Sequence, residues 1–209
     1  MTYASAERAA LCDLFERLGP EAPTLCAGWT TADLAAHLVL RERRPDALVG
    51  IAVPPLARYT ASVQQRIKSR PWPELIELVR RGPARWTRLI PGMDGAINTL
   101  EFFVHHEDVR RAQPGWEPRE LPAGLVDLLW KRLRGAMTKM MLRRAPVGVI
   151  LRRADGEAAG GKKAEPHVVV TGDPGELLMV VFGRQEHARV SWEGDQASVE
   201  RLHAANLGP

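Results

Sequence analysis

The chain has 209 residues, of which 45% are hydrophobic and 26% charged, and its formal net charge is +4. This length suffices for one large domain or for a domain with a small appendage. The two cysteines, Cys12 and Cys26, belong to no CxxC or Cys/His array, which argues against a disulfide framework or a zinc ribbon. The longest apolar run, 177–182, is far too short to span a membrane, so we expect a soluble cytoplasmic protein without a membrane partner.

Arginine supplies most of the positive charge, and a basic chain raises the question of nucleic-acid binding. The basic pairs are scattered, however, and fall mostly near the ends of expected helices, where cations interact favourably with the helix dipole and stay solvated. The sequence contains no zinc-finger or RNA-binding signature. We therefore expect no nucleic-acid partner.

The first part of the chain has the apolar periodicity of helices. The first expected helix covers residues 4–18 and ends at a Gly-Pro pair. The second begins around Thr30, because Thr30 and Asp33 have the spacing of a capping box, and it ends at Pro45. The remaining expected helices span residues 56–68, 74–81, 96–112 and 122–143.

After residue 146 the pattern changes to short, β-branched stretches, at 147–153 and 167–172. The polar, glycine-rich segment 155–166 between them predicts an exposed hairpin loop. Further expected elements are a helix over 174–181, a strand around 188–192 and a helix over 195–205. The chain is thus predicted to be α+β, with a helical bundle over residues 1–145 and a small α/β domain over 146–209.

The segment with the clearest chemical pattern runs from Asn98 to Ala112. On a helix, Glu101 and His105 are spaced i and i+4, and Asp108 returns to the same face at i+7. His106 points elsewhere around this helix. His37 lies on an apolar stripe of the second helix, which must face the interior of the bundle.

Two facing helices would combine His37, Glu101 and His105 into the ligand set of a catalytic zinc site with one position open. The same spacing also occurs in ordinary helices, and a histidine on an apolar face is often a hydrogen-bonded core residue. Asp108 is either an acceptor for a ligand imidazole or a partner of the following arginines. Cys26 is either a soft ligand or a buried apolar residue. Arg41, one turn beyond His37, either lines the mouth of the cleft or, as we favour, lies in solvent.

Two segments resemble the metal-binding bundle of the mycothiol-dependent maleylpyruvate isomerase family, within the DinB-like metalloenzymes. They are residues 25–37 (LCAGWTTADLAAH) and residues 101–112 (EFFVHHEDVRRA). The likeness is strongest to an actinobacterial group of metal-binding proteins. It implies a DinB-like four-helix bundle whose metal ligands are His37, Glu101 and His105. The run VVVTGDPGELLMVVFGR resembles the sterol-carrier-like C-terminal domain of these isomerases and places their Gly-Arg step, near the active site, at Gly183 and Arg184.

The resemblance implies a divalent metal, usually zinc, and mycothiol as a thiol cosubstrate. The expected function is that of a metal-dependent isomerase or thiol transferase acting on a small electrophilic substrate. Arg184 is expected to bind a carboxylate of the substrate or of the thiol, because its planar guanidinium forms paired hydrogen bonds with carboxylates. In the alternative, the chain is a non-catalytic protein that binds a metal and a small ligand, and Arg184 is a surface residue at the end of a helix.

Overall fold

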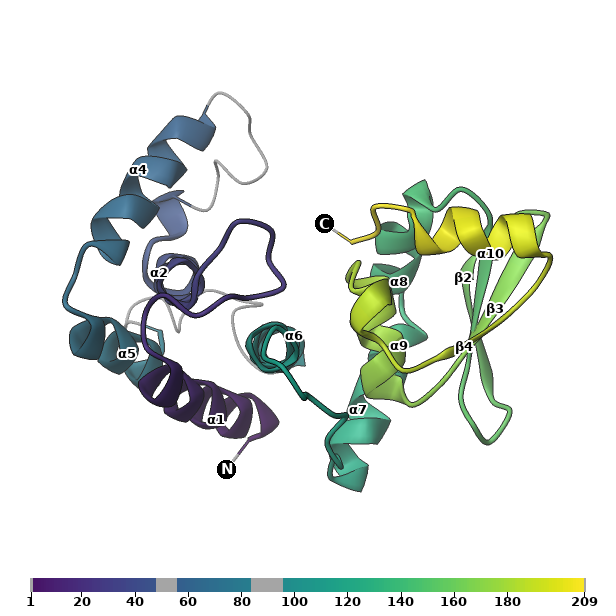
Figure 1. The fold of residues 1–209 in the computed structure, drawn as a ribbon, viewed down its shortest axis with the longest axis horizontal. Helices are drawn as coiled ribbons and strands as arrows, with labels where there is room; N and C mark the ends of the chain where they lie inside the picture. Colours follow the sequence, from purple (N-terminus) through teal and green to yellow (C-terminus); the bar gives the residue numbers. More distant parts are fainter. Residues whose placement is uncertain (1, 48–55, 84–95, 209) are drawn as a thin grey trace. The chain divides into compact units, whose positions relative to one another are not determined.

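The computed structural model describes residues 2–47, 56–83 and 96–208 (Figure 1). The chain forms two compact units, residues 1–116 and 117–209. The first unit is helical and the second contains a four-stranded sheet with helices, so the fold is α+β as predicted. Within the described residues, no helix has both the length and the apolar character needed to cross a bilayer.

The first unit consists of helices that pack around one apolar core. Helix α1 packs against α5 and α6, and α2 packs against α4 and α5. The largest core side chains are fully buried and come from several of these helices, including Leu11, Phe15, Leu34, Leu38, Leu75 and Phe102. The helices of this unit are α1 (Tyr3–Leu18), α2 (Thr31–Arg43), α4 (Ala57–Lys68), α5 (Trp72–Arg81) and α6 (Ala96–Arg111).

The predicted start of α2 is confirmed. The side chain of Asp33 accepts a hydrogen bond of 3.0 Å from the backbone N–H of Thr30, which satisfies a donor that the first turn of a helix leaves without an internal partner. Lys68 of α4 also contacts Asp33, at 2.7 Å. The capping residue therefore links α2 to α4 as well as starting the helix.

One buried carboxylate of the first unit, that of Glu42, is paired across helices. Arg8 of α1 forms an ion pair with the buried Glu42 of α2, donates to the backbone carbonyl of Val79 at 2.8 Å and lies 4.1 Å from the ring centre of Phe102. A buried carboxylate is tolerated only when it is compensated in this way. Arg8 therefore ties four helices together.

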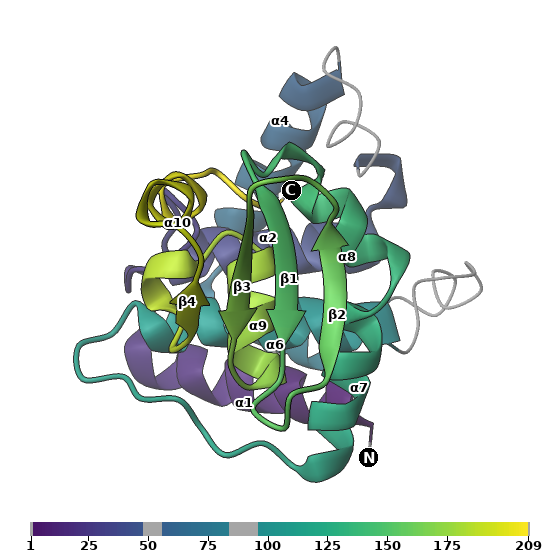
Figure 2. The same ribbon diagram turned by 90° about the vertical axis from the view of Figure 1, so that its right-hand side faces the viewer.

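The second unit contains a mixed sheet with strand order β2-β1-β3-β4. Strand β1 pairs in parallel with β3 and antiparallel with β2, and β4 pairs antiparallel with β3. Figure 2 shows β2 at the outer edge of the sheet. The strands are β1 (Gly148–Arg152), β2 (Ala158–Lys162), β3 (His167–Thr171) and β4 (Ser191–Glu193).

Four α-helices and two short 3-10 helices accompany this sheet in the described part of the second unit. Helix α7 packs against α9, α8 packs against β2, and α10 packs against β3. They are α7 (Ala123–Leu133), α8 (Ala136–Met141), the 3-10 turn η3 (Leu142–Arg144), α9 (Pro174–Val181), the short 3-10 helix η4 (Gln185–His187) and α10 (Gln196–His203).

The expectation of a hairpin loop over 155–166 is wrong, because this segment contains β2 and the strands on either side of it run parallel. Strand β1 is central, so its backbone groups need partners on both sides; β3 supplies one side and β2 the other. A glycine in β2 also lets the side chain of Leu142 pack closely against the strand, since a Cβ at Gly161 would lie 2.5 Å from Cδ1 of Leu142. Tertiary pairing thus overrides the low strand propensity of alanine and glycine.

Two boundaries also differ from the expectations. The single helix expected over 122–143 is divided into α7 and α8 at Gly135, whose extended backbone (ψ 179°) begins the second helix. The compact units divide at residues 116 and 117, instead of at residue 145, because α7 packs on α9 in the second unit.

We expect Gly148→Ala to lower the free energy of unfolding by about 2 kcal/mol, because overpacking of a buried position is destabilising. A Cβ at Gly148 would lie 2.1 Å from the carbonyl oxygen of Ala164 and 2.8 Å from Cβ of His167. Gly160→Ala in the adjacent strand is the matched control, because a Cβ there meets no atom within 4 Å. Urea denaturation of both variants tests the difference, and equal effects would contradict it.

Candidate metal centre

His37 of α2 and Glu101 and His105 of α6 lie together in the first unit. Their ligating atoms are all within 4.8 Å of one another. The imidazole rings of His37 and His105 meet edge to face, with ring centres 5.5 Å apart. One oxygen of Glu101 is 3.4 Å from Nε2 of His105. His37, which precedes Glu101 by 64 positions, is thus brought beside the Glu101 and His105 pair of α6.

Asp108 orients the ring of His105. Its Oδ2 is 3.0 Å from Nδ1 of His105, and its side chain is fully buried. A carboxylate only accepts hydrogen bonds, so Nδ1 carries the proton and the lone pair of a neutral His105 resides on Nε2, the atom nearest Glu101. Histidines that bind metals are commonly held in this way by a carboxylate on the opposite ring nitrogen.

Arg41 is half-buried beside the cluster, so of its two expected positions the favoured one in solvent is wrong and the one next to the site agrees with the structure. Its guanidinium is 3.7 Å from the second oxygen of Glu101 and donates a hydrogen bond of 2.8 Å to Oδ1 of Asn98. Asn98 precedes Glu101 by three residues on α6, and this i, i+3 spacing places both side chains on the face that Arg41 contacts. Asn98 is not among the predicted site residues, although its i, i+3 spacing to Glu101 is a signal in the sequence.

The two histidines have opposite pKa shifts. Burial is the main reason that the pKa of His37 falls to about 4, and the nearby positive charge of His105 adds to the effect. Burial also acts to lower the pKa of His105, but hydrogen bonds with Asp108, Cys26 and Glu101 outweigh it and raise that pKa well above its ordinary value. His37 is therefore neutral at pH 7 and presents a free lone pair.

Glu101 is ionised at neutral pH. Burial on its own would raise its pKa, but the hydrogen bond with His105 and the charge of Arg41 outweigh burial and lower the pKa to about 2. A neutral imidazole and an ionised carboxylate are the protonation states that metal ligands require. Because the pKa of His105 is raised, its Nε2 also carries a proton, and this is the proton that a bound metal has to displace.

A second group of potential ligands shares His105. Cys26, His105 and Asp108 also have ligating atoms within 4.8 Å of one another, and the thiol of Cys26 is 3.3 Å from Oδ2 of Asp108. The loop before α2 is held in place by the backbone N–H of Leu25, which donates to the carbonyl of Asp108 at 3.0 Å. The ring of His105 faces Asp108 through Nδ1 and Glu101 through Nε2.

The expectation that His106 points away from this cluster is confirmed. Its Nδ1 is 2.9 Å from Oε2 of Glu7 on α1, and both side chains are buried. Glu107, also fully buried, forms ion pairs with Arg110 and Arg111. His106 therefore links α6 to α1, whereas these ion pairs of Glu107 lie within α6, and His105 is left facing α2.

Arg184 belongs to the second unit. It follows Gly183, which has a φ of 83° and a position where a Cβ would lie 2.2 Å from the carbonyl oxygen of Leu207. Only glycine fits such a backbone next to such a close contact. The guanidinium of Arg184 donates to the carbonyl of Phe182. Its expected role towards a carboxylate remains a prediction.

The residues of the first group fit a divalent metal. They combine two imidazoles and a carboxylate, the donor set of many catalytic zinc sites, and the same set also suits non-haem iron. The exposed fractions of the His105 and Glu101 side chains, 12% and 28%, leave a route to the cluster from solvent. Trp29 packs against His37 with ring centres 5.1 Å apart and limits the access of water on that side.

In the metal-free protein, we expect His37 to titrate near pH 4. Between pH 6.5 and 4, the unfolded chain binds a proton at this residue that the folded protein does not bind, so stability falls by up to about 3 kcal/mol as pH decreases. His105 has the opposite sign, and its contribution is lost as pH rises above neutral. NMR titration of the imidazole protons, with His37→Gln to assign the signal, tests this; titration of His37 near 6.5 would contradict it.

Comparisons with known proteins support the fold. No protein-family model matches the sequence, and no curated protein matches it. The structure is similar to the crystal structure of the mycothiol-dependent maleylpyruvate isomerase, with a TM-score of 0.60, 13% sequence identity and coverage of 91% of this chain and 90% of that chain. A histidine-to-alanine mutant of the isomerase matches with a TM-score of 0.59, 12% identity and the same coverage. The chain therefore has the fold of this isomerase, as the resemblance implied.

Proposed function

We propose that this protein is a divalent-metal-dependent enzyme that uses a low-molecular-weight thiol as cosubstrate. The observation that carries this proposal is the cluster of His37, Glu101 and His105, whose ligating atoms lie within 4.8 Å of one another in a chain with the fold of a mycothiol-dependent isomerase. We assign zinc as the metal and mycothiol as the thiol. The substrate is a small electrophilic molecule, and it carries a carboxylate.

The first group of ligands is favoured over the second by the position of Asp108. When His105 binds through Nε2, Asp108 keeps its hydrogen bond with Nδ1 and holds the ring in place. Binding through Nδ1 would instead require Asp108 and Cys26 to exchange their present contacts for the metal. Asp108 is therefore a positioning residue in this proposal, and Cys26 helps to hold its carboxylate.

A zinc ion lowers the pKa of a coordinated thiol and so supplies a thiolate at neutral pH. The protein contributes three ligands, and this number leaves a coordination position for the thiol. Arg41 faces the second oxygen of Glu101 and keeps that carboxylate ionised and oriented. Trp29 shields His37 from water, which strengthens the electrostatic interactions inside the cluster.

Two reaction types agree with such a site. A thiol that adds to an activated double bond and leaves again after rotation about the resulting single bond produces an isomerisation. A thiol that stays attached produces a conjugate, which is the reaction of an S-transferase. The ligand cluster serves both reactions, and the substrate decides between them.

We expect the protein purified without added metal or affinity tag to contain about one equivalent of zinc, as a three-ligand site with an open position predicts. His37→Ala and His105→Ala should each lose it, because two remaining ligands bind the metal weakly. His167→Ala is the control, since His167 is exposed and lies in the second unit. Elemental analysis measures the metal content.

The variant Cys26→Ala separates the two groups of ligands. It should retain the metal if His37, Glu101 and His105 bind it. Loss of zinc in Cys26→Ala with retention in His37→Ala would assign the metal to Cys26, His105 and Asp108 instead. Retention of stoichiometric metal in both histidine variants would reject the proposed centre.

We further expect Arg184→Ala to weaken the binding of mycothiol to the zinc-loaded protein by roughly tenfold, the effect of losing a charged hydrogen bond. The metal content should not change. Arg132→Ala, an exposed arginine of α7, is the matched control. Isothermal titration calorimetry measures the affinity, and loss of zinc together with the affinity would reject the role assigned to Arg184.

A further inference from the structure

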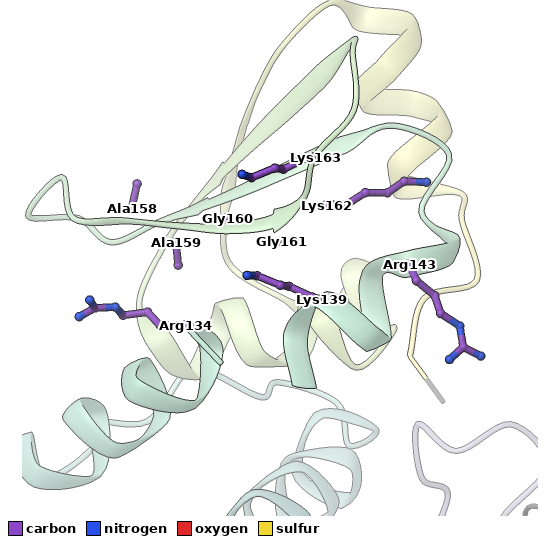
Figure 3. A pocket seen from close by; sticks show the side chains of 9 residues that line it. All are labelled: Arg134, Lys139, Arg143, Ala158, Ala159, Gly160, Gly161, Lys162 and Lys163. Atoms are coloured by element: carbon purple, nitrogen blue, oxygen red, sulfur yellow. The ribbon is translucent and has the colours of Figure 1, made fainter. Parts of the chain in front are cut away.

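A basic pocket lies in the second unit, between the edge of the sheet and the helices α7 and α8 (Figure 3). Its volume is about 780 Å³. Five of its nine lining residues are cations and none is acidic; the cations are Arg134, Lys139, Arg143, Lys162 and Lys163. Cations gathered around one space repel each other unless an anion joins them. The lining therefore favours an anionic ligand.

Most of this charge is not neutralised within the described residues. Arg134 forms an exposed ion pair of 2.8 Å with Glu157, and Lys162 donates a hydrogen bond of 2.6 Å to the neutral carbonyl of Ala145. Lys139, Arg143 and Lys163 form no ion pair in the part of the chain that the structure describes. Figure 3 shows Lys139 extending from α8 towards the strand that carries Gly160 and Gly161.

The pocket follows the open edge of β2. Its remaining lining comes from the same strand, so six consecutive residues, 158–163, border it. Successive residues of a strand face opposite sides of the sheet, and a space along the edge of the strand borders residues of both kinds. Strand β2 pairs with β1 on one side and is the last strand of the sheet on the other. The side chains along 158–161 are only alanine and glycine, which permits close approach of another backbone.

We propose that this pocket binds an extended acidic segment of a partner protein, which adds to the sheet beside β2. An open strand edge offers both N–H donors and C=O acceptors. A second peptide strand matches both kinds of group, whereas the anionic oxygens of a polyphosphate or nucleic acid would face the carbonyls without a donor. Pairing by main-chain hydrogen bonds supplies the affinity, and the five cations select acidic side chains.

The charge also excludes a second copy of this chain as the partner strand. Pairing β2 with β2 of another molecule would bring two sets of the same five cations together, and such like-charge contacts act against association. The residue pattern of the edge therefore combines a backbone that accepts a strand with side chains that reject a basic one. An acidic strand can pair with the backbone of the edge and is attracted by its cations.

The probe for this proposal is a fluorescein-labelled peptide of five threonine-glutamate repeats, which favours the extended conformation. We expect saturable binding to the full-length protein, measured by fluorescence anisotropy. The double variant Lys139→Glu/Arg143→Glu should weaken binding by about tenfold or more, because each reversal replaces an attraction with a repulsion. Lys131→Glu/Arg144→Glu makes the same change of charge at exposed positions outside the pocket, and it should change the affinity by no more than about twofold.

A second peptide distinguishes strand addition from attraction by charge alone. It has the same sequence with alternate backbone nitrogens methylated, which removes the donors needed for pairing. We expect this peptide to bind about tenfold more weakly or not at all, and the parent peptide to slow hydrogen exchange of the amides in residues 158–162. Equal binding of the two peptides would overturn the proposal. So would an absence of saturable binding, or binding of oligothymidylate and tripolyphosphate in preference to the peptide.

Discussion

The buried carboxylate of Asp108 is the group on which the candidate site depends. A carboxylate without solvent must be compensated, and here the imidazole of His105 and the thiol of Cys26 both contact it. The backbone of the same residue accepts a hydrogen bond from Leu25. Asp108 therefore connects α6 to the loop that leads into α2, and this connection brings His37 of α2 to the histidine that Asp108 orients.

The other buried charges of the first unit hold the framework around this site. Arg8 and Glu42 join α1 to α2, and His106 and Glu7 join α1 to α6. Neighbouring histidines of α6 thus have different tasks, because a helix turns successive side chains by roughly 100°. His106 faces α1 and stabilises the bundle, whereas His105 faces α2 and remains near solvent, where it can bind a metal.

In the second unit, the feature that bears on association with other chains is the edge of the sheet formed by β2. Strand edges with unpaired backbone groups invite pairing, and proteins often protect them with lysines and bulges. Strand β2 has a bulge and a border of cations, but also small side chains and a pocket along its length. In our proposal, the cations that act against pairing of two basic edges favour an acidic strand at the same edge.

Several features of this protein could be predicted from the sequence because they depend on local spacing. The start of α2 follows from the cap formed by Thr30 and Asp33, and the shared face of Glu101 and His105 follows from the helical repeat. The orientation of His106 away from that face has the same origin. Each of these depends on residues that are at most a few positions apart.

Only the tertiary structure decided the features that depend on distant partners. Residues 158–162 form a strand because β1 needs hydrogen-bond partners, although their composition favours a loop. Arg41 is drawn out of solvent by Glu101 and Asn98 of another helix, and Cys26 meets Asp108 across 82 positions of the chain. Local patterns state which side chains share a face, but the packing of whole elements determines what that face meets.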